Sequence, residues 1–178
     1  MIDALRAGAE WDVNFRPFSL NQVHVGEDEA PMWERPGDGS GLLALQYGIA
    51  ARDTQPDKFF DVHLALFAAR HDKGLRIKEP DVVLDAVREA GADLDALTEE
   101  VESGQPLKTV AAEHEESVAQ WGVFGVPTYI SGDQAVFVRT MHRAGTGQVG
   151  SGETVERILD YLENWTDLNE FKRTRIPR

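Results

Sequence analysis

The sequence predicts an α/β fold in which a long run of helices separates one strand from a β-hairpin. Residues 11–15 alternate apolar and polar side chains, as a half-buried strand does. Several segments between residues 41 and 122 have apolar residues at helical spacing. Two short apolar runs at 127–130 and 135–138 flank a Ser-Gly-Asp-Gln turn signal. The 178 residues are enough for one domain, or one domain with a sizeable insertion.

Composition excludes several classes of function. The chain is 42% apolar and 28% charged, with a net charge of −13, which is typical of a globular protein. So acidic a chain argues against partners such as nucleic acid or an anionic membrane surface. No apolar run approaches the length of a membrane span, and the N-terminus lacks the pattern of a secretory signal. We therefore expect a cytoplasmic protein.

The elements follow in a clear order along the chain. Residues 2–8 resemble the last turns of a helix that ends at a glycine, and the strand at 11–15 is closed by Pro17. Proline opens and glycine closes some of the helical segments, which is the usual asymmetry of helix ends. The predicted helices of the central run cover residues 41–53, 56–74, 80–91, 92–104 and 106–122. The hairpin and a helix at 153–165 complete the chain.

This order predicts an insertion. We expect residues 1–39 and 106–178 to form a core, with residues 40–105 as an inserted helical subdomain.

Pro127 stands at the start of a predicted strand. A proline is tolerated there because its missing N–H lies outside the ladder of hydrogen bonds. The alternative is a cis Val126–Pro127 bond, which would turn the chain sharply. Only about 5% of X–Pro bonds in folded proteins are cis, so the residues alone favour the trans form.

Beyond these patterns, the segment VAQWGVFGVPTYI at 118–130 resembles the cis-proline loop of the DsbA family. The inserted helices also match that family, and DVHLALFAARHDKG at 61–74 and LNEFKRTRIPR at 168–178 are similar to its bacterial cytoplasmic members. The resemblance extends from about Trp11 onward, and its most specific motif is Val126-Pro127-Thr128. It implies a thioredoxin-like, DsbA-type fold with an inserted helical domain.

The resemblance also implies a binding site. The residue before the cis-proline, here Val126, would offer its backbone N–H and C=O to a thiol- or disulfide-containing substrate or peptide. Pro127 and Thr128 would shape this edge. His114, on the helix that leads to the loop, is expected to be a core histidine, with a substrate-binding role as the lesser alternative. The partner could also include a second copy of the chain, as a homodimer.

The chain contains no cysteine, although the family places a Cys-x-x-Cys segment after its first strand. By analogy, both the first strand and the nucleophile would lie upstream of Met1. Three explanations are open: a longer native protein, a truncated paralogue without redox activity, or a reduced sheet in which residues 11–15 pair directly with residues 127–130.

The sequence thus predicts a thiol–disulfide oxidoreductase-like protein whose redox activity is in doubt. The alternatives are a noncatalytic module that binds a peptide or partner, and a glutathione-linked isomerase with an upstream serine. We assign no catalytic residue and expect no cofactor. No metal site is expected either, because His63 and His71 lie about 12 Å apart along their predicted helix.

Overall fold

The computed structural model describes residues 1–39, 41–140, 150–170 and 172, and its contacts divide the chain into two compact units. We call Phe15–Glu116 the helical unit. The hairpin unit combines Met1–Asn14 with Ser117–Arg178. The boundary falls inside helix α6, Gln105–Trp121. The core and insertion ranges expected from the sequence stay a prediction.

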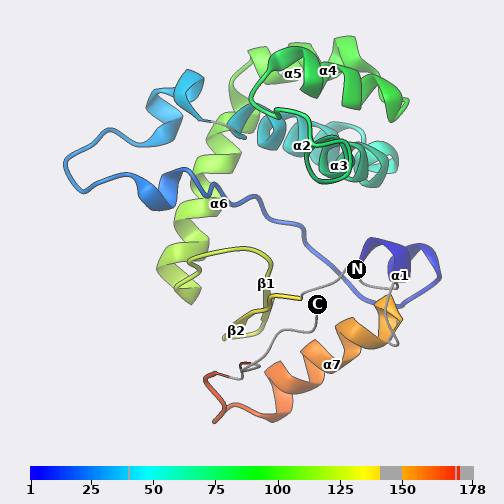
Figure 1. The fold of residues 1–178 in the computed structure, drawn as a ribbon, viewed down its shortest axis with the longest axis vertical. Helices are drawn as coiled ribbons and strands as arrows, with labels where there is room; N and C mark the ends of the chain where they lie inside the picture. The colour runs from blue at the N-terminus through cyan, green and yellow to red at the C-terminus, as the bar shows by residue number, and fades with distance from the viewer. Residues whose placement is uncertain (40, 141–149, 171, 173–178) are drawn as a thin grey trace. The chain divides into compact units, whose positions relative to one another are not determined.

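Helices α2, α3, α4 and α5 pack together in the helical unit (Figure 1). Helix α2 contacts α3, α4 and α5, and α3 also contacts α4. Pro56 and Pro80 stand in the first turns of α3 and α4, where a missing N–H costs no helical hydrogen bond. The bounds are Leu42–Thr54 for α2, Pro56–His71 for α3, Pro80–Glu89 for α4 and Leu94–Glu102 for α5. The helices predicted from residue 41 to residue 122 are thus confirmed, with small shifts at their ends.

The largest apolar core lies among these helices. Its innermost side chains are almost completely shielded from solvent: Ala50, Ala51, Val62, Val83, Val87 and Leu97. A second cluster joins Leu42 and Ile49 of α2 to Met32 and to Val110 of α6. Because Met32 precedes the helices in the chain, this cluster fixes residues 15–39 to the helical unit. Those residues contain the 3-10 turns η1 (Gln22–His24), η2 (Met32–Glu34) and η3 (Pro36–Asp38).

The hairpin unit contains a two-stranded antiparallel sheet in its described part. Strand β1, Thr128–Ser131, pairs with β2, Gln134–Phe137, so that Thr128 lies opposite Phe137. Gly132 has a φ of +59° at the first central position of the turn, as a type II′ turn requires. The predicted hairpin is therefore confirmed.

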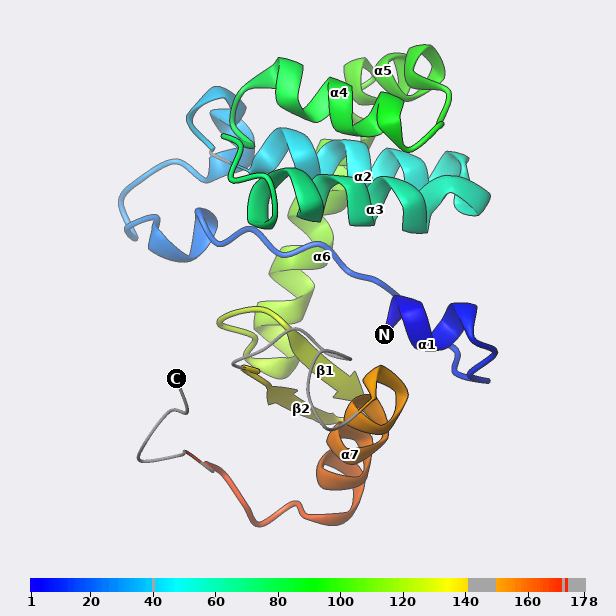
Figure 2. The ribbon, with the colours of Figure 1, turned by 45° about the vertical axis from the view of Figure 1, so that its right-hand side comes forward.

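Helix α7, Ser151–Asn164, contacts both strands and helix α1, Ile2–Arg6 (Figure 2). It buries one apolar stripe, formed by Val155, Ile158 and Leu162. These two helices confirm the helix predicted at residues 2–8 and the helix predicted at residues 153–165. The C-terminal segment at 168–178 was part of the family resemblance. Its residues 171 and 173–178 lie outside the described part of the chain.

The predicted strand at residues 11–15 is wrong. Residues 9–19 form no helix or strand, and they do not pair with β1 in the part of the chain that the structure describes. The alternation itself is present, since Trp11, Val13 and Phe15 are half-buried between exposed Asp12 and Asn14. Alternation reports which side chains are covered, whereas a strand also needs a neighbour to receive its hydrogen bonds.

None of the helices among the described residues combines the length and apolar character needed to cross a membrane.

Candidate functional site

The candidate site begins where α6 ends. Gly122 has a φ of +62°, and its N–H donates to the carbonyl of Val118 at 3.0 Å. This is the left-handed cap that closes many helices, and glycine adopts it without the steric cost of a Cβ. The chain leaves the helix here and enters the loop of residues 122–127.

The loop alternates between covered and exposed residues. Val123 is 7% exposed, and Gly125 is also buried. Phe124 is 66% exposed and Val126 is 45% exposed, while Pro127 is exposed as well. The loop therefore presents several apolar side chains outward within a few residues of one another.

The residues after the loop attach it to the hairpin. The Val126–Pro127 peptide bond is cis. The carbonyl of Pro127 accepts a hydrogen bond from the N–H of Val138 at 3.1 Å, which extends the ladder by one pair. The Thr128 hydroxyl donates to the carbonyl of Gly125 at 2.7 Å. Val126, Pro127 and Thr128 thus lie together at the entrance to β1.

Two phenylalanines border this entrance. The rings of Phe124 and Phe137 lie 5.2 Å apart, centroid to centroid, and Phe137 is 40% exposed. A Cβ on Gly125 would come within 3.3 Å of the Phe137 ring, so glycine lets the loop backbone approach it closely. We call Phe124, Val126, Pro127 and Phe137 the apolar loop face.

The outer edge of β1 carries backbone groups that point away from β2. Residues in an antiparallel pair alternate between hydrogen-bonded and non-hydrogen-bonded positions. Because Pro127 and Val138 form a hydrogen-bonded pair, Thr128 and Ile130 occupy the other kind of position. Their N–H and C=O groups therefore face outward. No described residue outside the hairpin forms a backbone hydrogen bond with them.

The loop and strand β1 carry no formal charge of their own. Residues 117–132 contain no Asp, Glu, Lys, Arg or His, although 28% of the whole chain is charged. Burial raises the pKa of the Tyr129 hydroxyl above its ordinary value, so this side chain is neutral as well. The arrangement can offer backbone hydrogen bonds and apolar contacts. It offers no thiol, because the sequence contains no cysteine.

His114 belongs to the helical unit, whereas the other three predicted site residues belong to the hairpin unit. It is 4% exposed, and its Nδ1 accepts a hydrogen bond from the N–H of Ser19 at 3.2 Å. Its ring lies 4.3 Å from that of Phe18 and 5.4 Å from that of Trp33. Burial lowers the pKa of His114. Its contacts are those of a core histidine, and its role toward a substrate stays a prediction.

Sequence reasoning missed both aromatic residues of the apolar loop face. Phe124 lies inside the segment at 118–130, but the sequence does not show whether its side chain is exposed. Phe137 could have been found from the predicted hairpin, because the register of the two strands places it opposite Thr128.

Comparison with known proteins gives one result that bears on this geometry. A family model described as "DSBA-like thioredoxin domain" matches residues 6–144, which is more than three quarters of the chain. A search of curated proteins found no significant match.

Proposed function

The chain belongs to the DSBA-like thioredoxin domain family, and from this we propose that Val126, Pro127 and Thr128 dock an extended segment of a thiol- or disulfide-containing polypeptide. The proposal concerns binding. The sequence contains no cysteine, so no exchange of thiol and disulfide is assigned to its residues. By analogy with disulfide oxidoreductases of this family, these residues would hold the substrate.

The backbone of the site supports binding of an extended segment. Thr128 and Ile130 direct N–H and C=O groups outward along β1. An unpaired strand edge is a template on which another extended chain adds as a further strand. Main-chain hydrogen bonds would then provide affinity for many sequences, and side-chain contacts would select among them.

The single observation that carries the proposal is the exposed, uncharged apolar loop face next to that edge. Phe124 and Val126 would contact apolar side chains of the bound segment. A small anionic thiol such as glutathione carries carboxylates, which cations usually bind. Residues 117–132 contain no cation, but Arg139 directly follows Val138, which pairs with Pro127, so glutathione is included in the test as a competitor. A cytoplasmic location and a homodimer stay predictions from the sequence.

The test is a binding measurement with a defined probe. A fluorescein-labelled peptide of nine Val, Phe, Ser and Thr residues is titrated with the protein, and anisotropy gives the Kd. The Phe124→Ser variant should bind about tenfold more weakly, because a large apolar contact is removed. Phe67→Ser is the matched control, since Phe67 is also exposed, at 54%, but lies in the helical unit.

Two outcomes would refute the proposal. Equal affinity of the wild type and Phe124→Ser would show that the apolar loop face does not bind the peptide. Displacement of the peptide by micromolar glutathione would show that the edge selects an anionic thiol instead.

A further inference from the structure

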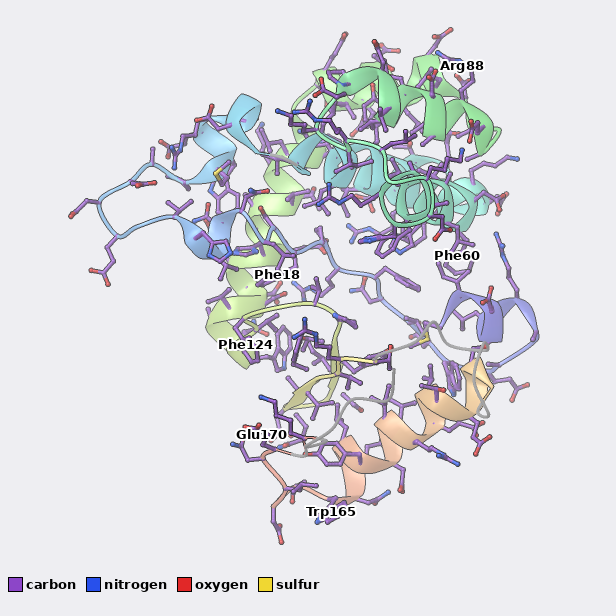
Figure 3. The ribbon with its side chains drawn as sticks, viewed as in Figure 1. Phe18, Phe60, Arg88, Phe124, Trp165 and Glu170 are labelled. Carbon is purple, nitrogen blue, oxygen red and sulfur yellow. The ribbon has the colours of Figure 1, made fainter. Side chains whose placement is uncertain are left out.

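Residues 15–39, which we call the strap, meet α6 at His114. The N–H of Ser19 donates to Nδ1 of His114 at 3.2 Å, and the ring of Phe18 lies 4.3 Å from the imidazole. Figure 3 shows Phe18 beside α6. All of these residues belong to the helical unit, so the contact lies inside one compact body.

The hydrogen bonds continue from this point into the strap. The hydroxyl of Ser19, a residue that is 3% exposed, accepts from the N–H of Gln22 at 3.3 Å. The side-chain carbonyl of Gln22 accepts from the N–H of Met32 at 2.8 Å. Met32 in turn packs against Leu42 and Val110 in the second core cluster. His114 therefore anchors a chain of contacts that orders the strap.

This anchor requires a neutral imidazole. Nδ1 can accept the Ser19 bond only without a proton, so the neutral ring carries its proton on Nε2. Protonation would add a hydrogen to Nδ1, which would then face the N–H of Ser19. Two donors cannot bond to each other. The charged ring would also be held in a place that is only 4% exposed, which is costly.

No charged neighbour offsets this cost in the described structure. On α6, the residues three and four positions from His114 are the uncharged Val110, Ala111, Ser117 and Val118. The titratable groups on the packed elements are Arg16, His24, Glu27, Asp28, Glu29, Glu34, Arg35 and Asp38 of the strap, and Lys108, Glu113, Glu115 and Glu116 of α6. None of them has a hydrogen bond or ion pair with the imidazole, and Arg16 pairs with Glu113 and Glu116.

We infer that His114 is an acid-released latch: protonation of its ring breaks the Ser19 bond and loosens the strap between Ser19 and Met32. The direction of its pKa agrees, because burial lowers it below the ordinary value of about 6.5. The released state binds the proton more tightly than the latched state. Release is therefore favoured as the pH falls from about 6.5 toward the lowered pKa of the latched ring.

Amide hydrogen exchange followed by NMR tests the latch on the whole chain. Rates are corrected for the intrinsic effect of pH and compared between pH 8 and pH 5. The amides of Ser19 and Met32 should lose protection by up to about tenfold per pH unit, as release coupled to one proton requires. The amides of Val83 and Leu97, in the main core, should lose less.

Two variants separate the latch from general acid sensitivity. His114→Asn keeps an acceptor near the position of Nδ1 but does not titrate, so its strap amides should show no such dependence on pH. His24→Asn is the matched control, because His24 lies in the strap but is exposed, and the wild-type dependence should persist. A wild-type strap with constant protection would overturn the inference, as would the same pH dependence in His114→Asn.

If the His114→Asn variant does not fold, a measurement on the wild type tests whether protonation of His114 loosens the strap. The ring protons of His114 are titrated by NMR, and the midpoint is compared with the onset of exchange at Ser19. Titration of the ring together with loss of Ser19 protection supports the latch. Titration without any change at Ser19 refutes it.

Discussion

His63 lies among aromatic rings on the helical unit. Its ring stacks on Phe67 at 4.7 Å, and those of Phe59 and Phe15 lie 5.6 Å and 5.8 Å away. Burial lowers the pKa of His63, so the folded protein favours the neutral imidazole. The unfolded chain binds a proton below about pH 6.5, whereas the folded chain resists it. His63 therefore makes folding less stable as the pH falls from that value toward the lowered pKa.

Replacing this ring should reduce the acid sensitivity of the fold. We expect His63→Phe to lose less free energy of unfolding than the wild type does between pH 7.5 and pH 5.5, since phenylalanine keeps the ring but cannot ionise. Urea unfolding at both pH values measures this difference. His71→Phe, at an exposed position of the same helix, should keep the wild-type dependence. An unchanged slope in His63→Phe would contradict the assignment.

Arg52 connects three segments of the helical unit. Its guanidinium donates to both carboxylate oxygens of Glu113, at 2.7 and 2.9 Å, and to the carbonyl of Phe15 at 2.9 Å. Burial would lower the pKa of Arg52, but the hydrogen bonds with Glu113 and Asp53 raise it above its ordinary value. A planar fork with several donors makes this set of contacts, which lysine cannot reproduce.

We expect Arg52→Lys to lower the free energy of unfolding by about 1.5–3 kcal/mol, the range for hydrogen bonds to charged groups. Chemical denaturation at pH 7.5 gives the value. Arg76→Lys is the matched control, because the Arg76 side chain is 70% exposed and its contact with Glu79 is a surface ion pair. That change should cost less than about 0.5 kcal/mol. Equal losses would mean that the Arg52 contacts add no specific stability.

At the scale of elements, the ends of helices followed from local chemistry. The sequence predicted that α6 ends at a glycine, and Gly122 takes the positive φ that such an end requires. Pro56 and Pro80 begin their helices as predicted. The strand at residues 11–15 failed for a different reason. Its pattern was local, but strand pairing depends on a partner elsewhere in the chain.

A pair of glycine substitutions should change stability in opposite directions. Gly48 lies inside α2, and an added Cβ would meet nothing within 4 Å, so Gly48→Ala should stabilise the protein by about 0.5–1 kcal/mol. Gly122→Ala would place a Cβ in the left-handed region and should cost about 1–2 kcal/mol. Thermal unfolding of both variants measures the difference. The same sign of change in both would contradict this interpretation of the helix end.

Both units of the molecule contain buried apolar residues. Leu97 and its neighbours fill the helical unit, whereas Val155, Ile158 and Leu162 of α7 are buried in the hairpin unit. Each unit therefore has apolar contacts of its own that stabilise it. The division by contacts could not be read from composition, because apolar residues are spread along the whole sequence.

Truncation of one core should act mainly on its own unit. Leu97 is completely buried, so Leu97→Ala should cost about 2–5 kcal/mol. Amide exchange should show the largest loss of protection in α2 to α5 and a smaller loss in α7. Leu64→Ala, at a position that is 36% exposed, is the control of matched chemistry and should cost much less. Equal loss of protection in α7 would show that the chain unfolds as one block.

The centre of the candidate site was predicted through a resemblance. The segment at 118–130 resembles the cis-proline loop of the DsbA family, and this resemblance pointed to Val126, Pro127 and Thr128. The pairing of Phe124 with Phe137 was not predicted, since it depends on how the loop turns and on the register of the hairpin. Exposure depends on the folded structure. From the sequence alone, these apolar residues would be expected to be buried in the core.

By itself the sequence determined the order of the helices, the hairpin and the lack of any cysteine, because each of these follows from residue type or local spacing, and its resemblance to a known family implied the type of fold. Only the tertiary structure decided that residues 11–15 lack a strand partner, that Phe124 and Val126 face outward, and that His114 accepts a hydrogen bond from Ser19. These features depend on contacts between residues far apart in the chain, or on which parts of the fold cover a side chain. A local sequence pattern contains neither kind of information.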